Sequence, residues 1–280
     1  MRLGAMTFVT DISINPVELA RELEARNFDS LFLAEHTHMP VTRAEADEPE
    51  LPEMYRRSYD PIVALTAAAV VTERLLVGTG VCLVAQRDPI LLAKEVACID
   101  RLSNGRFVLG AGFGWHRREM AHHGIDPADR WTLVREHIEA MRALWRDDEA
   151  SYDGTMVRFE ASWCWPKPTN PAGPPLFIGG AGGPRLIRHV IEYADGWLPN
   201  HSGPDVDAAL RTLRSEAERA GRDPATVRFM VPGPARAEFL EAQAAQGCER
   251  VLLPIPSAPR DEVLRFLDKH AAIAAEVNGS

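Results

Sequence analysis

The chain has 280 residues, of which 46% are hydrophobic and 25% charged, and its formal net charge is -9. This size and apolar content allow one large core, so we expect a single domain over residues 1–280, near the usual size of an α/β barrel. The acidic balance argues against nucleic acid or an anionic membrane as partner, because both favour a basic face, and it favours a small-molecule substrate.

The compartment is predicted from two further features. The cysteines Cys82, Cys98, Cys164 and Cys248 contain no CxxC pair, which indicates free thiols in a reducing compartment and no thiolate zinc site. No apolar run approaches the roughly 18 residues of a membrane span. We therefore expect a cytoplasmic protein that does not enter a membrane.

Short apolar runs alternate with longer amphipathic stretches along the whole chain, which is typical of repeated β-α units around a parallel sheet. Most runs lack strict polar alternation, as strands buried on both faces do. Eight strands are predicted, over residues 3–9, 30–34, 75–80, 107–111, 175–179, 196–199, 227–231 and 250–254. Four helix starts are marked by a favoured capping residue before proline, at Asn15-Pro16, Asp60-Pro61, Asp88-Pro89 and Gly203-Pro204.

Two segments depart from the simple repeat, and such loops over a barrel mouth carry function. Residues 37–59 are polar and contain prolines, so we expect them to fold over the mouth. Residues 149–173 contain the hairpin dipeptide Asp153-Gly154 and then Trp163 and Trp165, which predicts an excursion between the fourth and fifth strands.

Glu35, His36 and His38 follow the second predicted strand and should lie on the catalytic rim. An imidazole there suits proton transfer near neutral pH. A His-x-His pair at a strand end also fits a metal site, but that site needs later ligands, and Asp195 is the only obvious candidate. The third alternative is that these side chains only satisfy loop backbone groups.

Glycines follow the third and fourth predicted strands. Gly80 ends the third strand and lets a flat ring or another backbone approach closely, although a tight barrel corner explains it equally. Gly110, Gly112 and Gly114 alternate before Trp115, so a slot for a planar ligand walled by the indole is predicted. This spacing lacks the third glycine of the dinucleotide fingerprint.

The fifth predicted strand runs into a glycine-rich turn made of Gly179, Gly180, Ala181, Gly182 and Gly183. A helix is expected to follow this turn, and free amides at a helix N-terminus favour a phosphate. The alternative is a flexible β-α turn. No Gly-Lys-Ser/Thr follows, which excludes a P-loop nucleotidase.

These residues together resemble the luciferase-like monooxygenase superfamily, in particular its branch dependent on the deazaflavin coenzyme F420. The most specific matches are residues 86–94, residues 100–106, and residues 110–115 with Glu119. The resemblance implies a (β/α)8 TIM barrel with an insertion between strands 4 and 5, a cofactor across the strand ends, and a homodimer.

The resemblance also implies roles for individual residues. It places a non-prolyl cis peptide at Gly80-Val81 beneath the ring, His36 near the reacting ring, and Glu35 in contact with the ring. Gly179, Gly180 and Ala181 fall on its cofactor phosphate site. Trp115 stands where the sugar-phosphate dehydrogenases of the group carry a catalytic glutamate, so that substrate is not expected here.

The sequence thus predicts an F420-dependent oxidoreductase that transfers a hydride to or from a small organic substrate, with no metal in its site. The first alternative is an FMN-dependent monooxygenase that uses oxygen and receives reduced flavin from a separate reductase. A metal-dependent barrel hydrolase using His36 and His38 and a non-catalytic deazaflavin carrier are further alternatives.

Overall fold

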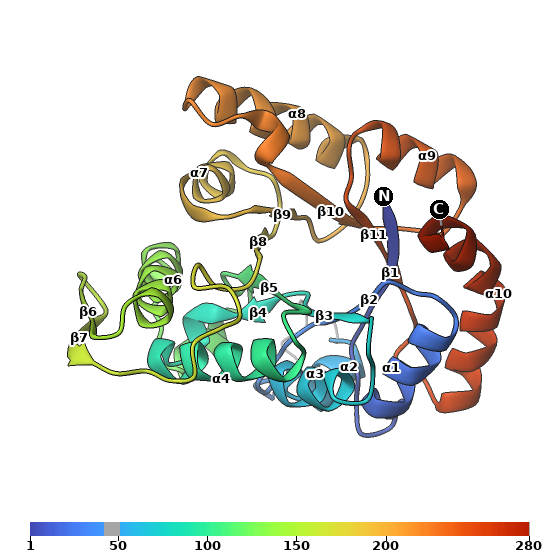
Figure 1. Ribbon diagram of the computed structural model, residues 1–280, viewed down its shortest axis with the longest axis horizontal. Helices are drawn as coiled ribbons and strands as arrows, with labels where there is room; N and C mark the ends of the chain where they lie inside the picture. Colours follow the sequence, from blue (N-terminus) through green and yellow to red (C-terminus); the bar gives the residue numbers. More distant parts are fainter. Residues whose placement is uncertain (42–50, 280) are drawn as a thin grey trace.

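The computed structural model describes residues 1–41 and 51–279, which form a closed barrel of eight parallel strands (Figure 1). The strands are β1 (Arg2–Thr7), β2 (Ser30–Leu33), β3 (Leu76–Thr79), β5 (Phe107–Gly112), β8 (Leu176–Gly179), β9 (Gly196–Leu198), β10 (Arg228–Pro232) and β11 (Arg250–Pro254). Pairing of β1 with β11 and of β3 with β5 closes the ring. All eight predicted strands are confirmed, and the fold is a (β/α)8 barrel.

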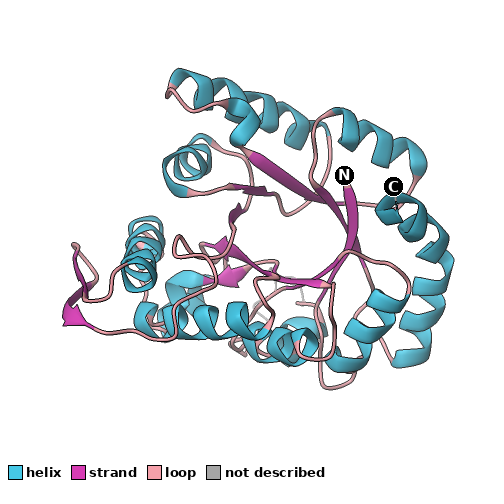
Figure 2. Ribbon diagram, in the orientation of Figure 1, coloured by secondary structure: helices cyan, strands magenta, loops and turns pink. Residues whose placement is uncertain are grey.

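Helices surround the barrel, as Figure 2 shows. They are α1 (Pro16–Ala25), α2 (Glu53–Arg57), α3 (Pro61–Ala69), α4 (Pro89–Leu102), α5 (Arg117–His122), α6 (Arg130–Arg146), α7 (Pro184–Tyr193), α8 (Pro204–Arg219), α9 (Ala237–Ala245) and α10 (Arg260–Gly279). Short 3-10 turns cover Val84–Gln86 and Pro224–Thr226. In the described part of the chain, no helix has the length and apolar character needed to cross a bilayer.

The four helix starts marked by proline are confirmed, since α1, α3, α4 and α8 each begin at the proline. At three of them the residue before proline caps the helix, because its side-chain oxygen accepts a backbone N–H two or three positions on. These side chains are Asn15, Asp60 and Asp88, at N···O distances of 2.9, 2.9 and 2.8 Å. Local chemistry therefore sets where these helices begin.

Two smaller strand elements complete the structure. The strand β4 (Cys82–Leu83) pairs with β5 just beyond the end of β3. The strands β6 (Ala150–Asp153) and β7 (Arg158–Ser162) form an antiparallel hairpin between α6 and β8 and pair with no barrel strand. The hairpin predicted at Asp153-Gly154 is thus present.

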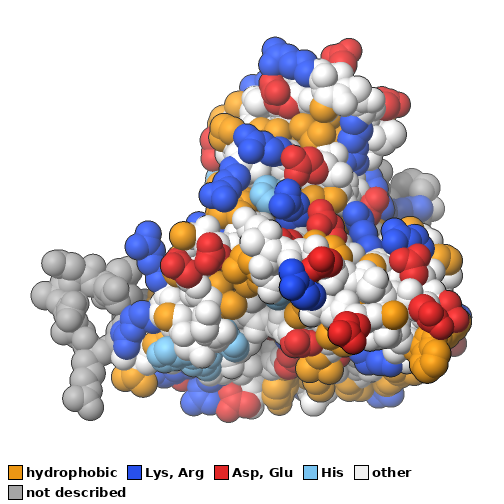
Figure 3. Space-filling model, turned by 90° about the vertical axis from the view of Figure 1, so that its left-hand side faces the viewer, with side chains coloured by type: hydrophobic (Ala, Val, Ile, Leu, Met, Phe, Trp, Pro, Cys, Tyr) orange, Lys and Arg blue, Asp and Glu red, His pale blue; other side chains and the backbone are white. Residues whose placement is uncertain are grey.

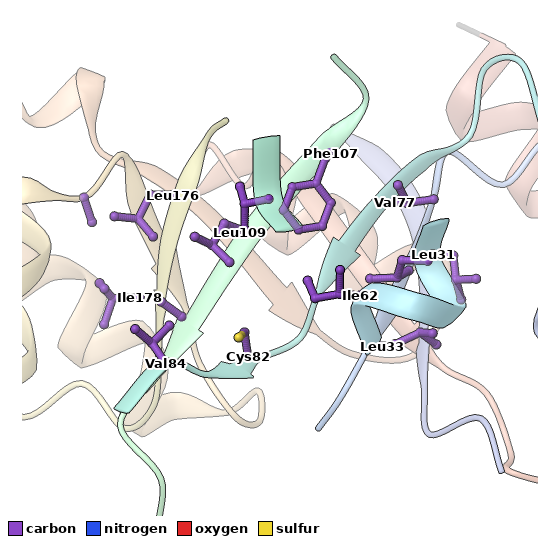
Figure 4. Packing of buried hydrophobic residues seen from close by; sticks show 14 of the residues in the cluster. Leu31, Leu33, Ile62, Val77, Cys82, Val84, Phe107, Leu109, Leu176 and Ile178 are labelled. Carbon is purple, nitrogen blue, oxygen red and sulfur yellow. The ribbon is translucent and has the colours of Figure 1, made fainter. Parts of the chain in front are cut away.

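The apolar core has two layers, because successive side chains of a strand point to opposite faces. Leu31 and Leu33 of β2 point outward toward the surrounding helices, where Ile62 of α3 lies (Figure 4). The intervening Phe32 points inward. The inner cluster consists of Phe32, Val108, Phe177, Leu198, Met230 and Leu252, with Met6 and Val81 packed against it.

Candidate active site

A cavity of about 410 Å³ opens at the carboxyl ends of the barrel strands. Its volume lies within the usual range of about 300–1,000 Å³ for small-molecule sites. Met6, Val81 and Leu198 contribute to its lining, and all three also pack in or against the inner cluster, so the barrel core forms part of the cavity wall. The cavity thus opens at the barrel mouth, where the site is predicted.

The peptide bond between Gly80 and Val81 is cis, as the family resemblance implied, and both residues line the cavity. The Val81 side chain packs against Gly112 and Gly179 on the two strands that follow β4 in the sheet. A Cβ atom at Gly112 would lie 2.5 Å from Cγ2 of Val81, and one at Gly179 would overlap its Cγ1. These glycines make room for the residue beneath the cavity.

This packing gives two predicted cofactor residues a different position from the one expected. Gly112 and Gly179 were expected to contact the cofactor, but neither lines the cavity, and both are buried beside Val81. A contact with the cofactor remains a prediction for both. The structure shows a packing role, which spacing along the chain did not reveal because Val81 lies in the segment between β3 and β4.

His36 lines the cavity, and its ring contacts the carboxylate of Glu119. Its Nδ1 lies 2.9 Å from Oε2 of Glu119, and the two side chains are 4% and 1% exposed. The other oxygen of Glu119, Oε1, accepts the backbone N–H of Thr37 at 3.0 Å. Burial acts to raise the pKa of Glu119, but the hydrogen bonds from His36 and Thr37 outweigh it and hold the pKa below its usual value.

The protonation of the His36 ring follows from this contact. An ionised carboxylate only accepts hydrogen bonds, so Nδ1 of His36 carries a proton. Nε2 is then the ring nitrogen available to a bound molecule. Glu119 belongs to the motif that carried the family resemblance, yet its role was not predicted, because the contact joins residues 83 positions apart.

Glu35 lines the same cavity, but its carboxylate is already engaged by groups around it. Its Oε2 accepts the backbone N–H of Leu83 at 2.7 Å, and its Oε1 accepts Nε and Nη2 of Arg87 at 2.9 and 2.6 Å. Arg87 also bonds Asp60 and contacts Glu95 at 3.3 Å. Burial disfavours the charged form of Arg87, but the Glu35 carboxylate outweighs this and raises the pKa of Arg87.

The contact of Glu35 with the cofactor ring remains a prediction. The structure shows that Glu35 also has a structural role. Its contact with Leu83 ties the second strand to β4, which follows the cis peptide. The ion pair with Arg87 lies at the start of the segment that leads into α4. Glu35 thus fixes the backbone beside the cavity.

Aromatic side chains surround His36. Phe8 lies parallel to the imidazole at a centroid distance of 6.2 Å, Tyr55 lies tilted at 4.8 Å, and Trp115 meets it edge-on at 5.7 Å. All three line the cavity, and Trp115 is 55% exposed. Trp115 therefore forms an open aromatic wall of the cavity.

The glycine-rich turn lies beside the mouth rather than in the cavity lining. Its Gly180 amide donates to Leu198, a lining residue, at 3.2 Å. Gly180 has φ 134°, a conformation that favours glycine, and its carbonyl accepts the indole N–H of Trp197 at 2.9 Å. Ala181 is exposed and Gly182 is partly exposed.

The same turn opens directly into helix α7, as predicted. Gly183 is exposed, caps α7 with φ -73°, and has open space where a side chain would be. The guanidinium of Arg185 lies 5.1 Å from the Trp131 ring centre. The turn therefore presents the positive end of a ten-residue helix at the rim of the barrel.

The three candidate ligands of the alternative metal site each contact a different partner. His36 bonds Glu119, whereas Nε2 of His38 lies 2.8 Å from Nδ1 of His122. Asp195 accepts the backbone N–H of Leu176 at the start of β8, away from the carboxyl ends of the strands. Over residues 1–41 and 51–279, no three His, Cys, Asp or Glu side chains are grouped as a metal centre requires.

The two predicted loop segments differ in their relation to the site. From residues 37–59, Met54 and Tyr55 of α2 line the cavity, while residues 42–50 lie outside the described part of the chain. Trp163 and Trp165 are 74% and 57% exposed and do not line the cavity.

Comparison with known proteins identifies the family. Residues 14–275 match the model of the family described as luciferase-like monooxygenase. The chain belongs to the luciferase-like monooxygenase family. Members of this family are oxidoreductases or monooxygenases, and the chain is thereby an enzyme of this broad class.

Three relatives illustrate the range of this family. An uncharacterized protein of Mycobacterium tuberculosis is 39% identical, over 97% of this chain and 98% of its own length. The F420-dependent glucose-6-phosphate dehydrogenase of Mycolicibacterium fortuitum is 28% identical, over 77% of this chain and 62% of its own. The crystal structure of the monooxygenase RslO1 from Streptomyces bottropensis matches with a TM-score of 0.81 and 19% identity, covering 99% of both chains, which shows the shared fold.

Proposed function

We propose that this enzyme is an F420-dependent oxidoreductase that transfers a hydride between the deazaflavin and a small, uncharged organic substrate. The observation that carries the proposal is the His36–Glu119 pair, which presents one imidazole nitrogen to the cavity at the barrel mouth. The similarity to an F420-dependent dehydrogenase over 77% of the chain supports this choice of cofactor.

The residues present fit such a cofactor in two places. The cavity wall formed by the Gly80-Val81 peptide carries no side chain at Gly80, so a flat ring would meet backbone there. The exposed turn before α7 would hold a phosphate at the helix N-terminus. Open space beside Gly183 leaves this end free. When bound, the deazaflavin would supply or accept the hydride.

His36 would exchange a proton with the substrate oxygen through Nε2. Glu119 holds the proton on Nδ1 and stabilises the imidazolium form when Nε2 gains a proton. The aromatic rings of Phe8, Tyr55 and Trp115 pack around the imidazole and limit the access of water. Glu35 keeps the neighbouring backbone in place through Leu83 and Arg87.

The cavity lining indicates the class of substrate. In the described part of the chain, it contains no lysine or arginine, and most of its side chains are apolar. Its buried acid, Glu35, is already paired with Arg87. Among the described lining residues an anionic substrate would find no lysine or arginine, which favours an uncharged ketone, aldehyde or alcohol.

We also propose that the enzyme acts as a homodimer in the cytoplasm, with reduced cofactor supplied by a separate enzyme. Val63 on α3 and Val70 just after this helix are 70% and 59% exposed, and Ile90 and Leu91 on α4 are 45% and 57% exposed. A second copy would bury these side chains. Light scattering measures the mass of the wild-type protein and of Val63→Asp. A dimer is expected for the wild type and a monomer for the variant.

The proposed reaction is tested by anaerobic turnover. Wild-type protein is given reduced F420 with a panel of ketones and aldehydes, and oxidised F420 with the matching alcohols. A change in F420 absorbance that accompanies product formation is expected for at least one pair, as a rise when reduced F420 is oxidised and as a fall when oxidised F420 is reduced. Formation of an oxygenated product with reduced FMN in air, and no turnover with F420, would instead identify an FMN-dependent monooxygenase. Cofactor binding without turnover across the panel would indicate a carrier.

A further inference from the structure

Hydrogen bonds from His36 and Thr37 to Glu119 join the two segments that carry His36 and Glu119. His36 lies just beyond β2, whereas Glu119 lies on α5, a helix of six residues. A helix this short has little stability of its own and depends on tertiary contacts. Thr37 supplies two of them, since its backbone N–H and its hydroxyl both donate to Oε1 of Glu119, at 3.0 and 3.4 Å. Whatever holds Thr37 therefore also holds Glu119.

Two histidines, His38 and His123, contact the Thr37 hydroxyl, and a third, His122, contacts His38. Nδ1 of His38 and Nε2 of His123 lie 3.0 and 2.7 Å from the Thr37 hydroxyl. Nε2 of His38 lies 2.8 Å from Nδ1 of His122, and these two rings stack at 5.1 Å with 15° between their planes. We call Thr37, His38, His122 and His123 the histidine clasp. Histidine side chains gather on the protein surface in Figure 3.

The contact between His38 and His122 depends on their protonation. A hydrogen bond between two imidazole nitrogens needs a proton on one and a lone pair on the other. When both rings are charged, every ring nitrogen carries a proton, so the two facing nitrogens are both donors and repel. The clasp is therefore complete only while at least one of His38 and His122 is neutral.

We propose that the histidine clasp positions Glu119 against His36, and that it opens when His38 and His122 are both protonated. The catalytic consequence rests on the proposed function, because it acts through the proton carried by His36. Among the described residues, Glu119 and Glu35 act on His123 through their charges, and Arg118 of α5 donates to the backbone carbonyl of Val41, three residues after His38. Burial and the charge of His38 lower the pKa of His123, which favours its neutral form.

Two surface variants isolate the clasp. His122→Ala removes the partner of His38, whereas His122→Asn keeps a hydrogen-bonding group there that does not titrate. His270→Ala is the matched control, because His270 lies on α10 and bonds Phe266. Both His122 and His123 are exposed, so these changes leave the core packing in place.

The measurement is hydrogen exchange of the Thr37 amide, followed by NMR in the whole protein and corrected for the intrinsic exchange rate at each pH. In wild type and His270→Ala, protection is expected to fall at least tenfold between pH 7.5 and pH 5.5. His122→Ala should be poorly protected at both values, and His122→Asn well protected at both. Equal protection at the two pH values in wild type, or wild-type protection in His122→Ala, would overturn the proposal.

This experiment is independent of the cofactor. Absence of F420 binding would refute the proposed function and leave the exchange result unchanged. If F420 turnover is observed, the clasp predicts that the acid limb of kcat follows the loss of Thr37 protection in wild type and is shifted to lower pH in His122→Asn. An acid limb that is the same in both proteins would contradict the link from the clasp to catalysis.

Discussion

Two buried carboxylates lie near His36, and their different partners give them different roles. Glu35 has both oxygens occupied by Leu83 and Arg87, so it fixes backbone and neutralises a cation. Glu119 gives one oxygen to the Thr37 amide and the other to the imidazole, so it sets which nitrogen of His36 faces the cavity. Burial is nearly the same for both, at 4% and 0% exposed. The partner of a buried acid, rather than its burial, distinguishes a structural carboxylate from one that assists a reaction.

The largest effect is expected from His36→Asn, which removes the proton-exchanging ring and keeps a polar side chain. Loss of general acid-base catalysis should lower kcat by roughly 100- to 10,000-fold. Cofactor binding should change little, because the proposed phosphate site lies at the turn before α7. Steady-state kinetics with a substrate found in the turnover panel measures this, and an undiminished kcat would refute the role of His36.

Glu35→Gln should act mainly on stability. Removing one partner of a buried ion pair costs about 3–5 kcal/mol, and Arg87 retains Asp60 and Glu95, so about 3 kcal/mol is expected. Chemical denaturation compares the free energy of unfolding of this variant with wild type. A variant as stable as wild type but strongly reduced in kcat would show that Glu35 acts on the reaction instead.

Glu119→Gln should show the opposite balance. The neutral amide weakens a charge-assisted hydrogen bond to His36 by about 1.5–3 kcal/mol, which corresponds to roughly a 10- to 150-fold lower kcat. Its free energy of unfolding should fall less than that of Glu35→Gln. Measuring kcat and the free energy of unfolding for both variants tests these roles. A larger loss of kcat in Glu35→Gln and a larger loss of stability in Glu119→Gln would contradict them.

The folding pattern was visible in the sequence because its signals are local. Capping residues before Pro16, Pro61 and Pro89 mark helix starts within three positions, and the closed order of eight strands follows from short apolar runs. The cis bond at Gly80-Val81 was implied by family resemblance alone.

The site was predictable in location but not in its contacts. His36 and Glu35 were expected at the mouth and both line the cavity. Which acid pairs with His36 depends on α5, far along the chain, so spacing could not separate Glu35 from Glu119. The packing of Val81 on Gly112 was hidden for the same reason, because it joins the segment between β3 and β4 to the end of β5.

The smallest predicted effect concerns the glycine turn and separates affinity from stability. Gly183→Asp and Gly183→Asn both introduce a favoured N-cap at φ -73°, where space is open, so neither should lower stability. Only aspartate places a negative charge where the cofactor phosphate is proposed. We expect about a tenfold weaker Kd for F420 with aspartate and about the wild-type Kd with asparagine. Equal Kd values for the two variants would show that the cofactor phosphate does not bind at this turn.

The central claim is that the barrel mouth binds a deazaflavin beside His36. Side-by-side equilibrium titration of purified wild-type protein with F420 and with FMN tests it most directly. We predict saturable F420 binding at micromolar concentrations and much weaker binding of FMN. Tight binding of FMN and no binding of F420 would indicate that the enzyme uses FMN. Binding of neither cofactor at micromolar concentrations would contradict the account.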